Sequence, residues 1–154
     1  MGYALLKFVH VGGAVLFLGT LLLSGVWMRR ALAAREAPSL EFALDGVGAT
    51  DLRVAAPGAA LLLVGGGGLL VGGGGELATQ AWLSGGILLF LVAALGWAVG
   101  LVPLQRQMRH ALRGAGRELP EACLRHGRHW HWAHLVTTLA AFAGLFLMVV
   151  RPGN

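Results

Sequence analysis

GYALLKFVHVGGAVLFLGTLLLSGVWM, residues 2–28, is the stretch that decides the fold, and Arg29 and Arg30 follow it directly. At about 1.5 Å of rise per residue, such a helix is long enough to cross a hydrocarbon layer of roughly 30 Å. The apolar run is too long for a signal-peptide core, so we expect it to remain as a membrane span. His10 lies inside it, and an ionisable side chain within a span is by default a candidate functional residue.

The whole chain has the composition of a membrane protein. Of its 154 residues, 56% are hydrophobic and 12% are charged, whereas soluble domains carry about 25% charged residues. The net charge of +5 would suggest nucleic acid for a soluble protein, but here arginines flank apolar segments, so we expect no nucleic-acid partner. The single cysteine, Cys123, excludes an internal disulfide and multi-cysteine metal sites.

These patterns predict an all-α, integral membrane four-transmembrane-helix bundle in a single domain, residues 1–154. We expect the spans at residues 3–28, 52–75, 82–102 and 129–150. The segments 29–53 and 104–128 are expected to be polar loops between them.

The first of these loops contains an apolar pattern of its own. SLEFALDGVG, residues 39–48, is expected to form a short surface helix with Leu40, Phe42 and Leu44 in the headgroup region. Thr50 and Asp51 are predicted to form the N-cap of the second span, which puts Asp51 at a membrane edge.

Small and less apolar residues follow one helical stripe along the first span. Its members recur every three or four positions: Lys7, His10, Gly13, Phe17, Thr20, Ser24 and Trp27. We expect this stripe to face protein and the Leu/Val face to meet lipid, which would place Lys7 and His10 inside the bundle, one turn apart.

The second span is unusually rich in glycine. Two tetraglycine runs begin at Gly65 and Gly72 and lie on the same side of the helix, two turns apart. This pattern indicates either close helix packing or a groove that admits a flat, bulky cofactor. In the third span, Gly96 and Gly100 form a GxxxG pair that predicts packing.

Basic residues are distributed unequally between the two sides of the membrane. The segments 29–53 and 104–128 carry ten arginines: Arg29, Arg30, Arg35, Arg53, Arg106, Arg109, Arg113, Arg117, Arg125 and Arg128. The opposite side has Lys7 and Arg151. The positive-inside rule therefore predicts cytoplasmic loops and both termini outside.

This orientation sets the depth of the histidines. His10 lies about 7–8 Å on the outer side of the membrane middle, and His134 lies about 9 Å on the cytoplasmic side. The two are thus roughly 16 Å apart along the membrane normal. Metal–nitrogen bonds are about 2 Å long, so we expect that His10 and His134 do not share one haem or one zinc ion.

Met148 is the candidate partner at the depth of His10. It lies near the outer end of the fourth span, about 12 Å from its middle, and a His/Met pair is a known haem ligation. The alternatives are a His10 that is hydrogen-bonded across helices and a Met148 that fills apolar space. Lys7 would either contact a haem propionate or extend to the interface.

A second group of histidines precedes and enters the fourth span. Its members are His126, His129, His131 and His134, with Trp130 and Trp132 among them. His131 and His134 share a face and are candidate metal ligands; the alternative is an interfacial aromatic belt. The spans contain no paired carboxylates at the midplane, which counts against an ion-coupled transporter.

Several ordered segments resemble a bacterial family of integral membrane proteins catalogued as domain of unknown function 2269. They are KFVHVGGAVLFLGTLLLSGVW, ATDLRVAAPGAALLLVGGG, LVPLQRQM, LPEACLRHGRHW and LFLMVVRP, and the resemblance covers nearly the whole chain. The family is remotely similar to copper-resistance D-type proteins and to the membrane-bound, haem-binding protoporphyrinogen oxidase. The KxxH motif of that oxidase maps onto Lys7 and His10 and implies that His10 is a haem ligand. Asp51, Pro57 and Met148 match further family positions.

From this resemblance we expect a haem b-binding integral protein of the bacterial inner membrane, in electron transfer or in haem- or porphyrin-linked redox chemistry. His10 is the expected iron ligand, with Met148 and Lys7 as further cofactor contacts. The lipid bilayer, a quinone or another redox membrane protein, and a second copy of the chain are the expected partners. The alternative is a cofactor-free structural or assembly subunit, or a small transporter.

Overall fold

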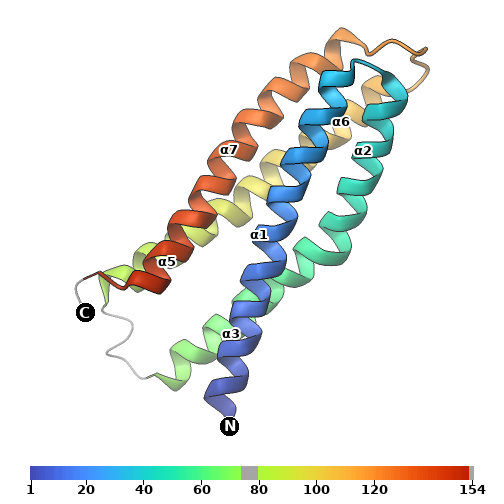
Figure 1. Ribbon diagram of the computed structural model, residues 1–154. Coiled ribbons are helices and arrows are strands. Elements are labelled where there is room, and N and C mark those ends of the chain that lie inside the picture. Colours follow the sequence, from blue (N-terminus) through green and yellow to red (C-terminus); the bar gives the residue numbers. More distant parts are fainter. Residues whose placement is uncertain (74–79, 153–154) are drawn as a thin grey trace.

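The protein is a bundle of four helical rods, seen in a computed structural model that describes residues 1–73 and 80–152. The rods are Gly2–Ala34, Ala37–Gly72, Ala81–Leu112 and Glu121–Val150, and each is long and apolar enough to cross a membrane. The described residues form no strand. The predicted all-α, four-span architecture is therefore confirmed (Figure 1). The end of the second predicted span, residues 74–75, lies outside the described residues.

Two of the rods contain a π-helical segment between two α-helices. The elements are α1 (Gly2–Ala34), α2 (Ala37–Thr50), η1 (Asp51–Ala55), α3 (Ala56–Gly72), α5 (Ala81–Leu95), η2 (Gly96–Leu101), α6 (Val102–Leu112) and α7 (Glu121–Val150). The rods are longer than the predicted spans because much of the polar segments 29–53 and 104–128 is helical.

The prediction that Thr50 and Asp51 cap a new helix is wrong. The backbone N–H of Asp51 bonds to the carbonyls of Gly48 and Val47, so the helix continues through this point. The real break is at Arg35, which takes a left-handed conformation with φ 55° and ends α1.

Each π-helical segment comes just before a proline. The N–H of Ala56 bonds to the Asp51 carbonyl, before Pro57, and the N–H of Val102 bonds to the Trp97 carbonyl, before Pro103. Proline has no N–H and its ring crowds the preceding turn. The wider π-turn accommodates the ring without ending the rod.

The rods associate as two pairs. Helix α1 packs along α3, and α5 packs along α7. The pairs meet toward the end that carries the polar loops, where α1 contacts α7 and α2 contacts α6. Toward the end that carries the two termini, the pairs diverge (Figure 1).

The core is concentrated where the pairs meet. Leu40 and Leu44 of α2 are 0% exposed and belong to this core, so their predicted place in the headgroup region is wrong. Phe42, on the opposite side of α2, is 72% exposed. The difference arises because α2 packs against α1 and α6, which buries one face of a helix expected to lie on the surface.

The stripe predicted along α1 faces protein over most of its length. Gly13, Phe17, Thr20 and Ser24 are buried, as predicted. Lys7 is exposed, contrary to prediction, because the helix pairs diverge at this end. Trp27 is also exposed, because Met28 follows Ser24 on the buried face.

The contact between α1 and α3 depends on glycine at a few positions. A Cβ atom on Gly13 would lie 2.6 Å from both the Gly58 carbonyl oxygen and the Leu62 nitrogen, which are backbone atoms. A Cβ atom on Gly12 would meet nothing within 4 Å. Backbone atoms cannot give way as a flexible side chain can, so a larger residue at Gly13 must separate the helices.

We therefore predict that Gly13→Ala destabilises the protein by about 1–3 kcal/mol. The matched variant Gly12→Ala should stay within about 0.5 kcal/mol of wild type. Unfolding in detergent, followed by helical circular dichroism, measures both. Equal stability of the two variants would contradict this packing.

Candidate functional site

His10 lies half-buried on the face of α1 that contacts α3. Its Nδ1–H donates a hydrogen bond of 2.9 Å to the backbone carbonyl oxygen of Leu62. The partner accepts only, so Nδ1 must carry the proton. In the neutral imidazole, Nε2 is then an unprotonated acceptor with a lone pair available to a ligand.

The first tetraglycine run makes room for this histidine. A Cβ atom on Gly65 would lie 2.6 Å from the backbone nitrogen of His10. A Cβ atom on Gly66 would lie 3.0 Å from the ring atoms Nδ1 and Cε1 of the same residue. On this side of α3 the glycines serve close packing, and α1 occupies the space expected for a groove. Gly67 has nothing within 4 Å of an added Cβ, and neither has Gly72, the first glycine of the second run, so α3 is open at these two positions.

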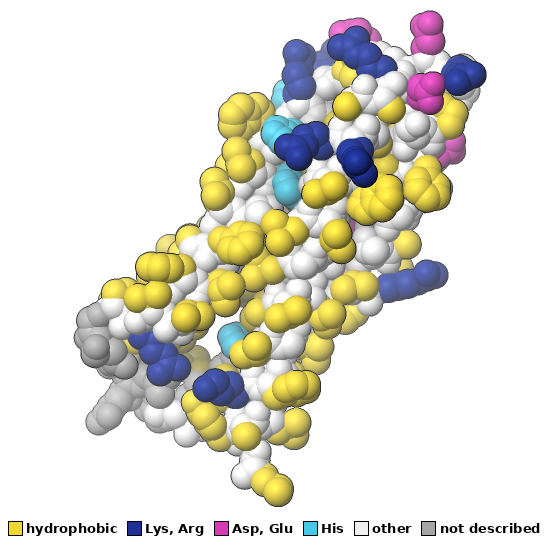
Figure 2. Space-filling view, in the orientation of Figure 1, with side chains coloured by type: hydrophobic (Ala, Val, Ile, Leu, Met, Phe, Trp, Pro, Cys, Tyr) yellow, Lys and Arg dark blue, Asp and Glu magenta, His cyan; other side chains and the backbone are white. Residues whose placement is uncertain are grey.

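Met148 does not pack on the same helix pair as His10. A Cβ atom on Gly86 of α5 would lie 2.5 Å from the Met148 Cε atom, so the thioether packs on α5. Figure 2 shows a hollow between the two helix pairs at the end that carries the termini, with a histidine side chain in its wall. His10 lies near the N-terminal end of α1, at this end of the bundle, and Lys7 lies one turn away on the same helix.

His134 occupies a separate place on α7. Its Nε2–H donates a hydrogen bond of 2.8 Å to the Leu21 carbonyl oxygen, and its ring stacks on Trp130 at 4.8 Å between centroids. Leu21 is three turns beyond His10 on α1, about 16 Å along the helix. The two histidines are therefore too far apart to ligate one metal, as predicted.

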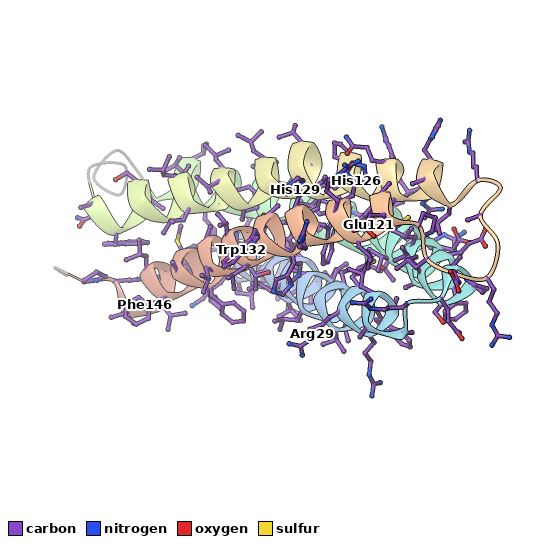
Figure 3. The ribbon with its side chains drawn as sticks, turned by 90° about the horizontal axis from the view of Figure 1, so that it is seen from above. Arg29, Glu121, His126, His129, Trp132 and Phe146 are labelled. Carbon is purple, nitrogen blue, oxygen red and sulfur yellow. The ribbon has the colours of Figure 1, made fainter. Side chains whose placement is uncertain are left out.

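The other histidines of α7 are spread around the helix. Figure 3 labels His126, His129 and Trp132 along successive turns of α7. Within residues 1–73 and 80–152, no three His, Cys, Asp or Glu side chains are grouped as a metal site. His131 is exposed and His134 uses one ring nitrogen on Leu21, so metal binding by this pair stays a prediction.

A buried polar cluster joins the second and third rods. Asp51 is only 6% exposed. Its Oδ1 accepts a hydrogen bond of 3.1 Å from Trp97 Nε1, and its Oδ2 accepts one of 3.0 Å from Gln105 Nε2. A buried carboxylate is stable only when such donors replace water.

The sequence interpretation placed Asp51 at a membrane edge and did not predict its burial against a second rod. Asp51 lies in the interior of the rod Ala37–Gly72, and its two partners lie on the neighbouring rod. The sequence contains one pattern that both residues share: Asp51 precedes Pro57 by six positions, and Trp97 precedes Pro103 by six. Asp51 is the first residue of η1 and Trp97 lies in η2, so the hydrogen bond between them joins the two π-helical segments.

A family model described as "Predicted integral membrane protein (DUF2269)" matches residues 4–152. The chain belongs to the DUF2269 family. No curated protein and no solved structure matches it. Membership confirms the family resemblance and the integral membrane class, which places this DUF2269 protein in contact with a lipid bilayer.

We predict that Asp51→Ala destabilises this DUF2269 protein by about 1–3 kcal/mol, because the buried Gln105 and the partly buried Trp97 lose their acceptor. Asp51→Asn keeps one acceptor oxygen and should therefore lose less stability than Asp51→Ala. The control is Asp45→Ala, which removes a 65% exposed partner of Arg109 and should cost at most about 1 kcal/mol. Thermal unfolding in detergent ranks the three variants, and an Asp45→Ala loss as large as that of Asp51→Ala would contradict the assignment.

Proposed function

We propose that this DUF2269 protein binds haem b through His10 and takes part in electron transfer or porphyrin-linked redox chemistry. The hydrogen bond from His10 Nδ1–H to the Leu62 carbonyl carries the proposal. Metal-ligating histidines almost always donate their second ring nitrogen to a carbonyl or carboxylate, which fixes the tautomer and the ring orientation. His10 has this arrangement, with Nε2 as the nitrogen left for iron.

The surroundings of His10 support a large apolar ligand. The helix pairs diverge at this end, and Figure 2 shows a hollow between them that is bordered by hydrophobic side chains, a histidine and basic side chains. Lys7 is an exposed cation one turn from His10, at a place suited to a propionate. Met148 belongs to the opposite pair, and ligation by its sulfur would require the side chain to turn away from Gly86.

When bound, haem iron supplies one-electron redox chemistry. The chain contributes the binding and the environment. The Leu62 carbonyl orients the imidazole, and the glycines of α3 let α1 approach closely enough to form this hydrogen bond. The bilayer location favours a quinone or another redox membrane protein as the electron partner.

The arginine-rich loop end supports the orientation in the membrane. By the positive-inside rule, this end is cytoplasmic and both termini are outside, in a bacterial inner membrane. His10 would then lie in the outer half of the bilayer, and electrons would be exchanged from that side. A second copy of the chain is a further proposed partner.

One observation favours a second candidate function, a cofactor-free structural or assembly subunit. The His10 ring lies against Gly66, and Gly65 contacts the His10 backbone, so the histidine also serves the α1–α3 contact. In this case the hydrogen bond to Leu62 would be its whole role. The two functions differ in whether Nε2 binds anything.

An absorption spectrum of the protein purified from haem-supplemented cells distinguishes the haem-binding function from the cofactor-free one. We expect a Soret band that His10→Ala reduces to background, because iron loses its nitrogen ligand. His129→Ala removes an exposed histidine of α7 and should keep the band. Met148→Ala should shift the band rather than abolish it.

Thermal unfolding of the apoproteins must accompany the spectra, so that loss of haem is distinguished from loss of fold. A wild-type protein that stays colourless after haem supplementation would contradict the haem proposal and favour the cofactor-free structural function. The same holds if His10→Ala keeps the full Soret band.

A further inference from the structure

A groove between α1 and α7 at the loop end carries an excess of positive charge. Its volume is about 580 Å³. Arg29 and Arg35 line it from the α1 side, and Arg128 lines it from α7. Glu121 is the one acidic side chain in its lining, so three guanidinium groups face a single carboxylate.

The groove arginines are available for an external anion. The ion pairs formed within residues 1–73 and 80–152 join Arg109 to Asp45 and Arg117 to Glu36. Arg29, Arg35 and Arg128 take part in neither. Arginine is suited to phosphate because its planar guanidinium offers parallel N–H donors to two oxygens.

A buried donor adds a second indication of a ligand. Trp130 lines the groove, is 1% exposed, and its Nε1–H has no hydrogen-bond partner among the described residues. Buried polar groups in native proteins are rarely left without a partner. Because less than 1 Å² of this nitrogen is exposed, a phosphate or glycerol oxygen can accept its hydrogen bond only when the neighbouring side chains move aside.

The surface next to the groove is apolar and faces the membrane. Trp132 lines the groove and is 65% exposed, and Val136 and Leu139, further along α7, are 58% and 59% exposed. Figure 2 shows histidine and basic side chains grouped at the loop end beside this apolar surface. Exposed tryptophan is typical of the level of lipid headgroups.

We propose that this groove binds the phosphate group of an anionic phospholipid, whose acyl chains lie along the exposed apolar surface of α7. A free phosphate would use the arginines alone, whereas a phospholipid uses both the charge and the adjoining apolar face. Basic pockets between membrane helices are known sites for anionic headgroups. The site is separate from His10 and does not depend on haem binding.

Native mass spectrometry of the detergent-solubilised protein, titrated with phosphatidylglycerol or phosphatidylcholine, tests the proposal. The test variant is Arg29→Gln/Arg128→Gln. The matched control is Arg30→Gln/Arg125→Gln, which removes the same charge from exposed arginines on the same two helices that do not line the groove. We expect wild type and the control to prefer phosphatidylglycerol, and the test variant to bind it about tenfold more weakly or worse.

Three results would overturn the proposal. Equal weakening in the test variant and the control would mean attraction by surface charge in general. Equal binding of the two lipids would mean apolar contact alone. Displacement of phosphatidylglycerol by millimolar glycerol phosphate would mean a site for a soluble phosphate. Arg128→Gln alone, compared with Arg125→Gln, provides the same contrast if the double variant does not fold.

Discussion

The close backbone contact between α1 and α3 is the constraint on which the rest of the structure depends. Within lipid, apolar side chains gain little by leaving the solvent, so helices associate through van der Waals packing and hydrogen bonds between them. Gly13 lets α1 approach the Gly58 carbonyl and the Leu62 nitrogen, and Gly65 lets α3 approach the His10 backbone. The same approach brings the His10 imidazole within hydrogen-bond distance of the Leu62 carbonyl. A functional side chain and a structural contact therefore share one pair of helix faces, which explains why both a cofactor role and a packing role remain consistent with this residue.

The two ends of the bundle are built differently. At the loop end, α2 and α6 form the ends of the second and third rods, and a core that includes Leu40 and Met108 is fully buried. There Asp51 links the second rod to Trp97 and Gln105 on the third. At the end that carries the termini, the α1/α3 and α5/α7 pairs diverge (Figure 1). The packed loop end and the open end that carries the termini therefore offer different binding sites. We place the proposed haem at the open end, and the proposed phospholipid in the charged groove at the loop end.

The sequence alone predicted the features that depend on hydrophobic length and residue spacing within one helix. Hydrophobic length fixes four spans, and the three-to-four spacing from Gly13 to Ser24 identifies the buried face of α1. The family resemblance also follows from local motifs, and the DUF2269 match over residues 4–152 confirms it. The candidate site was predicted only in part: His10 was found as an ionisable group in a span, but its acceptor, Leu62, could not be found, because any carbonyl of a neighbouring helix could have served.

Only the tertiary structure decided which polar and apolar groups are buried, because burial depends on how the rods pair and not on spacing within one rod. Leu40 and Leu44 belong to the core because α2 meets α1 and α6, and Lys7 is exposed because the pairs diverge beside it. Asp51 became a buried acceptor because its rod continues through a π-turn and meets donors more than forty positions away. Met148 packs on Gly86 because α7 pairs with α5, and a shared membrane depth alone could not reveal that partner.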